Sequence, residues 1–272
     1  MNNEILPDFD IDYLKNINFH KNDENTSLDE ETHIYNIQGE YGFTSMTTFI
    51  HSLFNDFDAD KIITNMMSSK NWENSKYYGM TREEIKQLWE KNKINASENG
   101  TQMHLNIEQF YNGAIINNTS KEWEYFMKFY HDYNEKLEPY RTEWIVYDKQ
   151  LKIAGSIDMI FKPKPSIIEN GKEVLDIYDW KRCKEIIKVS NFDKWAKNSH
   201  INHIPDTNYW HYAFQLNGYK WILEHNYNKI IRDMYLVCLH PNNSNNSYIL
   251  IKLPNLQNEI KILFEERIMN IN

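Results

Sequence analysis

The sequence is poor in cysteine, glycine and proline, with 2, 8 and 7 of these residues among 272. Two cysteines are too few for a four-thiolate zinc site or for an iron–sulfur cluster, and they provide no disulfide framework. We expect Cys183 and Cys238 to be small, buried apolar residues. The HExxH and CxxC spacings are also missing, which argues against zinc bound by His104 and Glu108.

Long apolar runs, a basic leader and a phosphate-binding loop are missing as well. The first residues, MNNEILPDFDIDYLKN, lack the basic start and apolar centre of a signal peptide, and no run approaches membrane-spanning length. We therefore expect an intracellular protein, in the cytoplasm or nucleus, without a membrane partner. Without a Gly-x4-Gly-Lys-Ser/Thr loop, no nucleotide cofactor is expected. A helicase or recombination partner would be a separate chain.

Basic residues are outnumbered, 30 against 39 acidic residues, which leaves a net charge of -9. This balance argues against nucleic-acid binding by bulk charge but leaves a local basic groove open. Such a groove is one interpretation of a basic stretch around Trp195, which comprises Arg182, Lys184, Lys188, Lys194 and Lys197. A solvated surface is the other. The nearby aromatic residues, which could stack on bases or belong to the core, are Tyr209, Trp210 and Tyr212.

Hydrophobic periodicity changes along the chain from helical to strand spacing. Residues 1–30 are acidic and rich in Asn, which predicts a flexible or loosely attached segment before a single domain at 31–272. Helices are predicted after the caps at 44–48 and at Thr81, from Gly100, over 121–137, over 208–226 and at the C-terminus. Strands are predicted at 33–37, 143–148, 151–161, 173–181, 234–240 and 248–253. This order predicts an α/β fold, with a central mixed sheet flanked by helices and an N-terminal helical part.

The predicted strand LKIAGSIDMIF carries a carboxylate in its interior. Because side chains alternate in a strand, Asp158 should share a face with Ala154 and Ser156, while Ile157 and Met159 point the other way. The small neighbours leave space above the carboxylate. A charge at such a position is tolerated when it is paired or binds a metal.

The next predicted strand ends in D-W-K, where Asp179 and Lys181 share a face. If the two strands are neighbours, Asp158, Asp179 and Lys181 converge. Two adjacent carboxylates favour a divalent cation, and oxygen ligands favour Mg²⁺ or Mn²⁺, which can polarise a phosphodiester and activate water. Taken alone, D-x-K is a weak signal, because a salt bridge between Asp179 and Lys181 is the simpler explanation of it.

Four motifs in order are more specific than any one of them: GTQMH (100–104), GSID (155–158), DWK (179–181) and QLNGY (215–219). Together they resemble the PD-(D/E)XK nuclease superfamily, above all its RecB-like exonuclease branch, with relatives in large DNA viruses and among mitochondrial genome-maintenance exonucleases. The resemblance covers about residues 33–255 and implies a restriction-endonuclease-like core. Two departures are modest: Ile157-Asp158 replaces the name-giving Pro-Asp pair, and the four-cysteine iron–sulfur cluster of some members is missing.

The resemblance also implies roles for individual residues. The residues implied to bind the metal are His104, Asp158 and Asp179. Lys181 would be the catalytic lysine, while Gln215 and Tyr219 would brace the active site and contact the nucleic-acid strand. Two glutamates stay open: Glu108 either hydrogen-bonds His104 or faces solvent, and Glu143 either reaches a metal or pairs with Arg141.

These observations predict a Mg²⁺- or Mn²⁺-dependent deoxyribonuclease, an exonuclease acting on DNA ends or single strands in repair, recombination or replication. A structure-selective endonuclease with the same residues is a close alternative. A non-catalytic nucleic-acid-binding module on a nuclease-like fold is a third possibility. It would be expected to lack one of the residues Asp158, Asp179 and Lys181, all of which are present.

Overall fold

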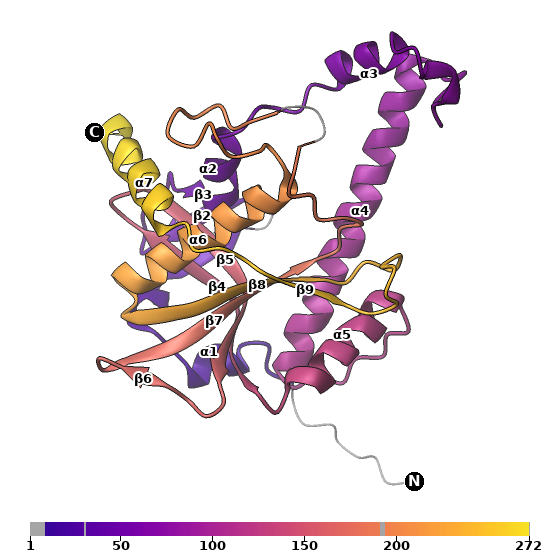
Figure 1. Ribbon diagram of the computed structural model, residues 1–272. Helices are drawn as coiled ribbons and strands as arrows, with labels where there is room; N and C mark the ends of the chain where they lie inside the picture. Colours follow the sequence, from indigo (N-terminus) through magenta and orange to yellow (C-terminus); the bar gives the residue numbers. More distant parts are fainter. Residues whose placement is uncertain (1–8, 30, 191–193, 272) are drawn as a thin grey trace, which may run out of the picture.

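A computed structural model of the chain describes residues 9–29, 31–190 and 194–271. Figure 1 shows its helices and strands. In chain order they are α1 (Tyr13–Ile17), the 3₁₀ turn η1 (Lys21–Asp23), β1 (Thr26–Asp29), β2 (Ile34–Ile37), β3 (Thr44–Ser45), α2 (Met46–Ser52), α3 (Ala59–Met67), the 3₁₀ turn η2 (Trp72–Asn74), α4 (Arg82–Tyr111), α5 (Lys121–Tyr133), β4 (Leu137–Asp148), β5 (Ile153–Pro163), β6 (Ile168–Glu169), β7 (Lys172–Lys181), α6 (Asn208–Asn226), β8 (Lys229–Cys238), β9 (Ile249–Lys252) and α7 (Gln257–Ile271).

Within the described residues, seven strands form one mixed sheet. β4 and β5 pair antiparallel along their length, and β7 pairs antiparallel with the far end of β5. β8 then runs parallel to β7, and β9 runs antiparallel to β8. The short β3 and β6 add to β5 and β7. The predicted class, a mixed α/β fold with helices flanking a mixed sheet, is confirmed.

Helices cover the sheet on both faces, and each face has its own apolar core (Figure 1). The first core lies under α2, α6 and α7 and includes Phe49, Phe214 and Phe264. The second core lies under α4 and α5 and includes Ile107 and Phe126. Fully burying one side chain of this size contributes about 1.5–3 kcal/mol, so both helical layers are held firmly against the sheet. β4, β5 and β7 are thus enclosed between helices whose polar side chains can reach the strand ends.

α4 is one continuous helix, and the prediction that a new helix begins at Gly100 is wrong. Thr81 and Glu84 form a capping box at its start, and no proline interrupts the residues that follow. Glycine inside a helix costs about 1 kcal/mol relative to alanine. Packing of Met103 and Ile107 in the second core offsets this cost. Figure 1 shows the first half of α4 projecting beyond the sheet, with α3 at its far end.

The helix predicted over 121–137 ends earlier, at Tyr133, because the chain enters β4 at Leu137. Pro139 therefore lies inside a strand instead of ending a helix. β4 pairs only with β5 and is an edge strand, where a proline leaves no ladder hydrogen bond unmade.

The N-terminal segment was predicted to be loosely attached, and residues 9–29 contradict this. Leu14 is 3% exposed in the second core. Asp23 forms a 2.6 Å ion pair with Arg141 of β4. Its partner lies 118 positions further along the chain, so local composition carried no sign of it. Residues 1–8 and residue 30 of the same prediction lie outside the described residues.

Asn217 fixes α6, the helix that carries Gln215 and Tyr219. Its side chain is fully buried, donates to the Pro254 carbonyl at 3.0 Å and accepts from the Leu256 N–H at 2.8 Å. We expect Asn217→Ala to lower the free energy of unfolding by about 2–4 kcal/mol, because both backbone groups lose their partner in the interior. The midpoint of urea denaturation measures this loss.

The control for this experiment is Asn99→Ala, on the exposed surface of α4. It should change the unfolding free energy by no more than about 0.5 kcal/mol. Equal midpoints for the two variants would show that Asn217 does not anchor α6.

Candidate metal-dependent active site

Three polar side chains from three separate elements come together: His104 from α4, Glu143 from β4 and Asp158 from β5. The imidazole Nδ1 lies 3.5 Å from Asp158 Oδ2 and 3.7 Å from Glu143 Oε1. One possible ligand atom of each residue lies within 4.8 Å of those of the other two. In the described part of the chain, no other group of three or more His, Cys, Asp or Glu side chains comes together in this way.

Side-chain alternation in β5 is interrupted where the carboxylate lies. Ile157 and Ile160 both pack in the first core, although residues three apart in a regular strand face opposite ways. Met159 packs in the second core, so the prediction that Ile157 and Met159 share a face is wrong. Asp158 thus lies at the position where the alternation of side chains between the two cores shifts by one residue.

β4 is irregular at the matching position. Pairing on either side places Glu143 opposite Asp158. Glu143 has a φ of 41°, a backbone conformation that non-glycine residues rarely adopt and that recurs at functional sites. Its Oε2 accepts a 2.8 Å hydrogen bond from the Ser156 hydroxyl. Two neighbouring strands therefore lose their alternation together, and both carboxylates reach the same histidine.

A hydrogen bond to β7 orients His104. The ring Nε2 lies 2.9 Å from the carbonyl oxygen of Trp180. A carbonyl can only accept, so Nε2 carries a hydrogen, and in the neutral ring Nδ1 presents its lone pair toward Asp158 and Glu143. Burial disfavours the protonated ring, but the two carboxylates outweigh it and raise the pKa of His104 to about 9. A proton and a cation would thus compete for the same atom.

The two strands that carry the predicted acids are neighbours, as expected from the sequence. Their ladder is paired as far as Met159 and Tyr178, and one further step places Asp158 opposite Asp179. Beyond that pair, Asp158 Oδ2 accepts the Trp180 N–H at 2.9 Å. Burial raises the pKa of Asp158, against the opposing effects of His104 and Lys181.

The buried Asp179 and the partly buried Lys181 form an ion pair beside the group of three. Asp179 is 3% exposed, and Lys181 Nζ lies 2.6 Å from its Oδ2, without the alignment of a hydrogen bond. Burial and the nearby Asp158 raise the pKa of Asp179 to about 7, although Lys181 opposes them. Burial alone would lower the pKa of Lys181, but the negative charges of Asp179 and Asp158 have the larger effect and raise this pKa above its usual value. The amine therefore stays charged.

α6 covers the opposite face of the sheet from α4, and it brings Tyr219 against β5 at Gly155, with Gln215 beside Tyr219. Gln215 Nε2 lies 3.3 Å from the Tyr219 hydroxyl and 3.2 Å from the Thr47 hydroxyl. The close approach requires Gly155 of β5, because a Cβ there would lie 2.6 Å from the Tyr219 hydroxyl. Gln215 and Lys181 both line an open pocket of about 400 Å³.

Of the two glutamates that the sequence left open, Glu143 belongs to the group of three and Glu108 does not. Arg141, the alternative partner for Glu143, binds Asp23 instead. Glu108 lines a separate, smaller pocket, of about 80 Å³, together with Glu143. The position of Glu143 relative to Asp158 follows from the hairpin of β4 and β5. The hairpin closes at the pair Asp148 and Ile153, and counting back from this pair places Glu143 opposite Asp158.

Two residues of the basic stretch make contacts with other side chains of the protein. Arg182 forms a 2.7 Å ion pair with Glu122, and the Lys188 ammonium lies 4.6 Å from the Tyr209 ring centroid. The exposed members of the stretch are Lys184, Lys188, Lys194 and Lys197. Of the aromatic residues, Tyr209 is buried in the first core and Trp210 packs against it, while the Tyr212 ring lies 4.8 Å from Lys181 Nζ. Cys238 is buried as expected, and Cys183 is only partly buried.

The residues present fit a hard divalent cation. Two carboxylates and one imidazole face each other, which suits Mn²⁺ or Mg²⁺ when water completes the coordination. Asp179 adds a buried oxygen, Oδ2, that lacks an aligned hydrogen-bond donor. Burial raises the pKa of Asp158 and Asp179 although His104 and Lys181 oppose it, and a bound cation would favour the charged carboxylates.

Comparisons with known proteins give little to add to this geometry. No protein-family model and no curated protein matches the chain. A solved structure titled "Crystal structure of SSO0001" aligns with 84% of this chain and 75% of its own, at 15% identity and a TM-score of 0.30. That similarity is too weak to indicate a shared fold. Among the described helices, none has the length and apolar character needed to cross a membrane.

Proposed function

We propose that this protein is a Mg²⁺- or Mn²⁺-dependent DNA nuclease with a PD-(D/E)XK-type active site, acting in repair, recombination or replication. The observation that supports it most is the convergence of His104, Glu143 and Asp158 beside the Asp179–Lys181 pair. Four of these five residues come from motifs quoted above for the nuclease resemblance. Glu143 lies outside these motifs; the sequence left its role open, and the geometry places it in the group.

The residues that would hold the metal are His104, Glu143 and Asp158, with Asp179 next to them. A bound divalent ion would supply an activated water and would neutralise charge on the phosphodiester. Glu143 and Asp158 approach from neighbouring strands and His104 from a helix on the sheet, so their separations are set by packed elements. This rigidity favours a site that is formed before substrate binds.

Lys181 is suited to stabilise negative charge. Its raised pKa keeps the ammonium charged at neutral pH, so it donates hydrogen bonds to a water or a phosphate oxygen and does not act as a base. Asp179 holds the ammonium from one side, and the Tyr212 ring lies near it. Preorganised charge of this kind is most effective in a site from which water is excluded once substrate is bound.

The pocket of about 400 Å³ beside Lys181 is the proposed place for the DNA strand. It is lined by the Tyr212 ring and the Gln215 amide, which can contact a base and the backbone. The resemblance to RecB-like enzymes favours attack from an end. A structure-selective endonuclease would use the same residues, so the choice of DNA substrates must distinguish the two activities.

The test is digestion of end-labelled single-stranded, blunt double-stranded and circular DNA with Mg²⁺ or Mn²⁺. We expect mononucleotides or short products from the linear substrates and no cleavage of the circle. Lys181→Ala should lower the rate by about 10²–10³-fold, because the ammonium no longer stabilises charge in the transition state.

Lys184→Ala is the matched control, since Lys184 is exposed and lies three positions further on. It should leave the rate of digestion within about twofold of the unsubstituted protein. Digestion that Lys181→Ala does not slow would overturn the proposed site. If the circular DNA is nicked and the nicking requires Lys181, the protein is an endonuclease and not an exonuclease.

A further inference from the structure

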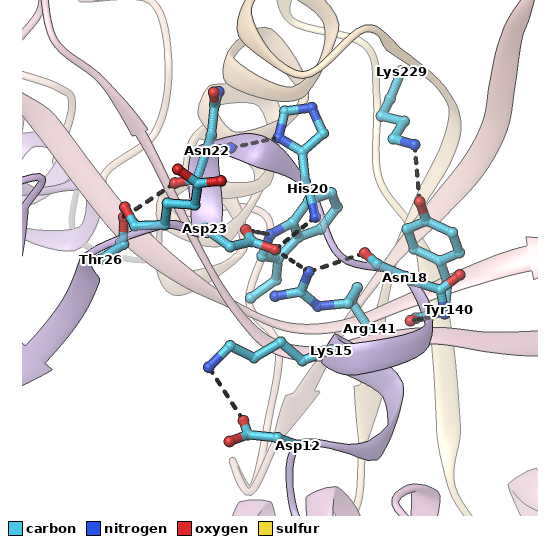
Figure 2. Close-up of polar contacts among 12 residues, drawn as sticks. Asp12, Lys15, Asn18, His20, Asn22, Asp23, Thr26, Tyr140, Arg141 and Lys229 are labelled. Carbon is cyan, nitrogen blue, oxygen red and sulfur yellow. Dashed lines mark hydrogen bonds and ion pairs between the residues drawn. The ribbon is translucent and has the colours of Figure 1, made fainter.

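The N-terminal segment is hydrogen-bonded to two residues of β4, Arg141 before and Trp144 after the strained Glu143 backbone. Asp23 accepts a hydrogen bond from Arg141 Nη1 at 2.6 Å and another from the Trp144 indole at 2.8 Å. Figure 2 shows Asp23 facing the Arg141 guanidinium, with the Asn18 carbonyl on the same guanidinium. One carboxylate from residues 9–29 thus joins two positions of β4.

These contacts lie in the interior. The side chains of Arg141 and Asp23 are 3% and 4% exposed, and Trp144 is fully buried. The Arg141 guanidinium lies 4.7 Å from the centroid of the Trp144 ring. A buried charge that loses its partner is strongly disfavoured, so Asp23 and Arg141 remain together as long as the segment is docked.

The arrangement depends on the unusual backbone at Glu143. Arg141 and Trp144 are three positions apart and in a regular strand would face opposite sides of the sheet. Both nevertheless reach Asp23, because alternation is interrupted between them by the φ of 41° at Glu143. The same interruption turns the Glu143 carboxylate toward His104. Binding of Asp23 and presentation of Glu143 therefore require one backbone conformation.

A second polar contact joins this region to α4. Asn112, at the end of the helix that carries His104, donates to the Thr142 hydroxyl at 2.9 Å. Its side-chain oxygen accepts the Leu14 N–H, also at 2.9 Å. Asn112 is 4% exposed. Hydrogen bonds of Asn112 thus join the N-terminal segment, β4 and α4 at Thr142, the residue before Glu143.

We infer that Asp23 is a positioning residue for the metal site: by holding Arg141 and Trp144, it keeps Glu143 in the strained conformation that completes the ligand set. The inference rests on the metal-dependent function proposed above. According to this inference, residues 9–29 contribute to metal binding, although none of their side chains belongs to the group of three.

The test is a Mn²⁺ titration of the full chain followed by electron paramagnetic resonance, which measures the dissociation constant without any reaction. Asp23→Ala should weaken Mn²⁺ binding by about tenfold or more, the usual effect of removing a group that orients a metal ligand. Thermal denaturation is recorded for each variant, and titrations are run well below its midpoint. Asp12→Ala, an exposed change in the same segment, should bind Mn²⁺ like the unsubstituted protein.

Trp144→Phe serves if Asp23→Ala does not fold, since it keeps an aromatic ring and removes only one hydrogen bond to Asp23. It should weaken Mn²⁺ binding less than Asp23→Ala but measurably. An unchanged dissociation constant in a folded variant, even with a lowered melting temperature, would overturn the positioning role and leave the proposed function intact. Absence of Mn²⁺ binding in the unsubstituted protein would overturn both.

Discussion

Asp158→Asn is expected to abolish metal-dependent DNA hydrolysis, lowering its rate by about 10³-fold or more. The amide of asparagine has no negative charge to offer a divalent cation. Position 158 lies next to both His104 and Glu143 in the group of three, so the change removes a central ligand. The amide oxygen can still accept the Trp180 N–H, so the backbone contact to β7 survives. Initial rates on end-labelled single-stranded DNA at saturating Mg²⁺ measure the effect.

Stability distinguishes loss of chemistry from loss of fold in this variant. Burial raises the pKa of Asp158, which means that the interior disfavours the charged carboxylate. A neutral amide should therefore leave the melting temperature unchanged or raise it. Asp60→Asn, an exposed change on α3, is the control and should retain full activity. A rate within tenfold of the unsubstituted protein for Asp158→Asn would remove this residue from the site.

Gly155→Ala is expected to destabilise the protein by about 1–3 kcal/mol, the typical cost of overpacking an interior. The new methyl group would lie 2.6 Å from both the Cε1 atom and the hydroxyl of Tyr219. Tyr219 is 3% exposed and packs in the first core, so it has little room to withdraw. Thermal denaturation should show a lowered midpoint, by about 2–4 °C per kcal/mol in a chain of this size.

A double-mutant cycle tests whether that contact is responsible. Tyr219→Phe removes the hydroxyl and with it part of the overlap, so Gly155→Ala should cost less in its presence. The two changes are then non-additive, by about 0.5 kcal/mol or more. Additive effects would show that the methyl group is accommodated elsewhere and that Gly155 is not required for the approach of α6.

The sequence by itself determined most of the elements around the site. Apolar alternation placed Asp158, Asp179 and Lys181 on strands, and these strands are neighbours. Helical periodicity predicted residues 208–226 as one helix, which are the bounds of α6. These features are local, because capping, periodicity and hairpin connections act over a few residues and are legible in any short window of sequence.

Tertiary structure alone decided how the site is completed. Asp23 meets Arg141 from 118 positions away, and no local pattern announces such a contact. Packing on the second core carries α4 straight through Gly100, against the preference of glycine. Glu143 reaches His104 because two paired strands give up their alternation together, and that strained conformation is held by buried contacts from distant segments. Residue types and their order thus follow from local chemistry, while the direction in which each carboxylate points follows from long-range packing.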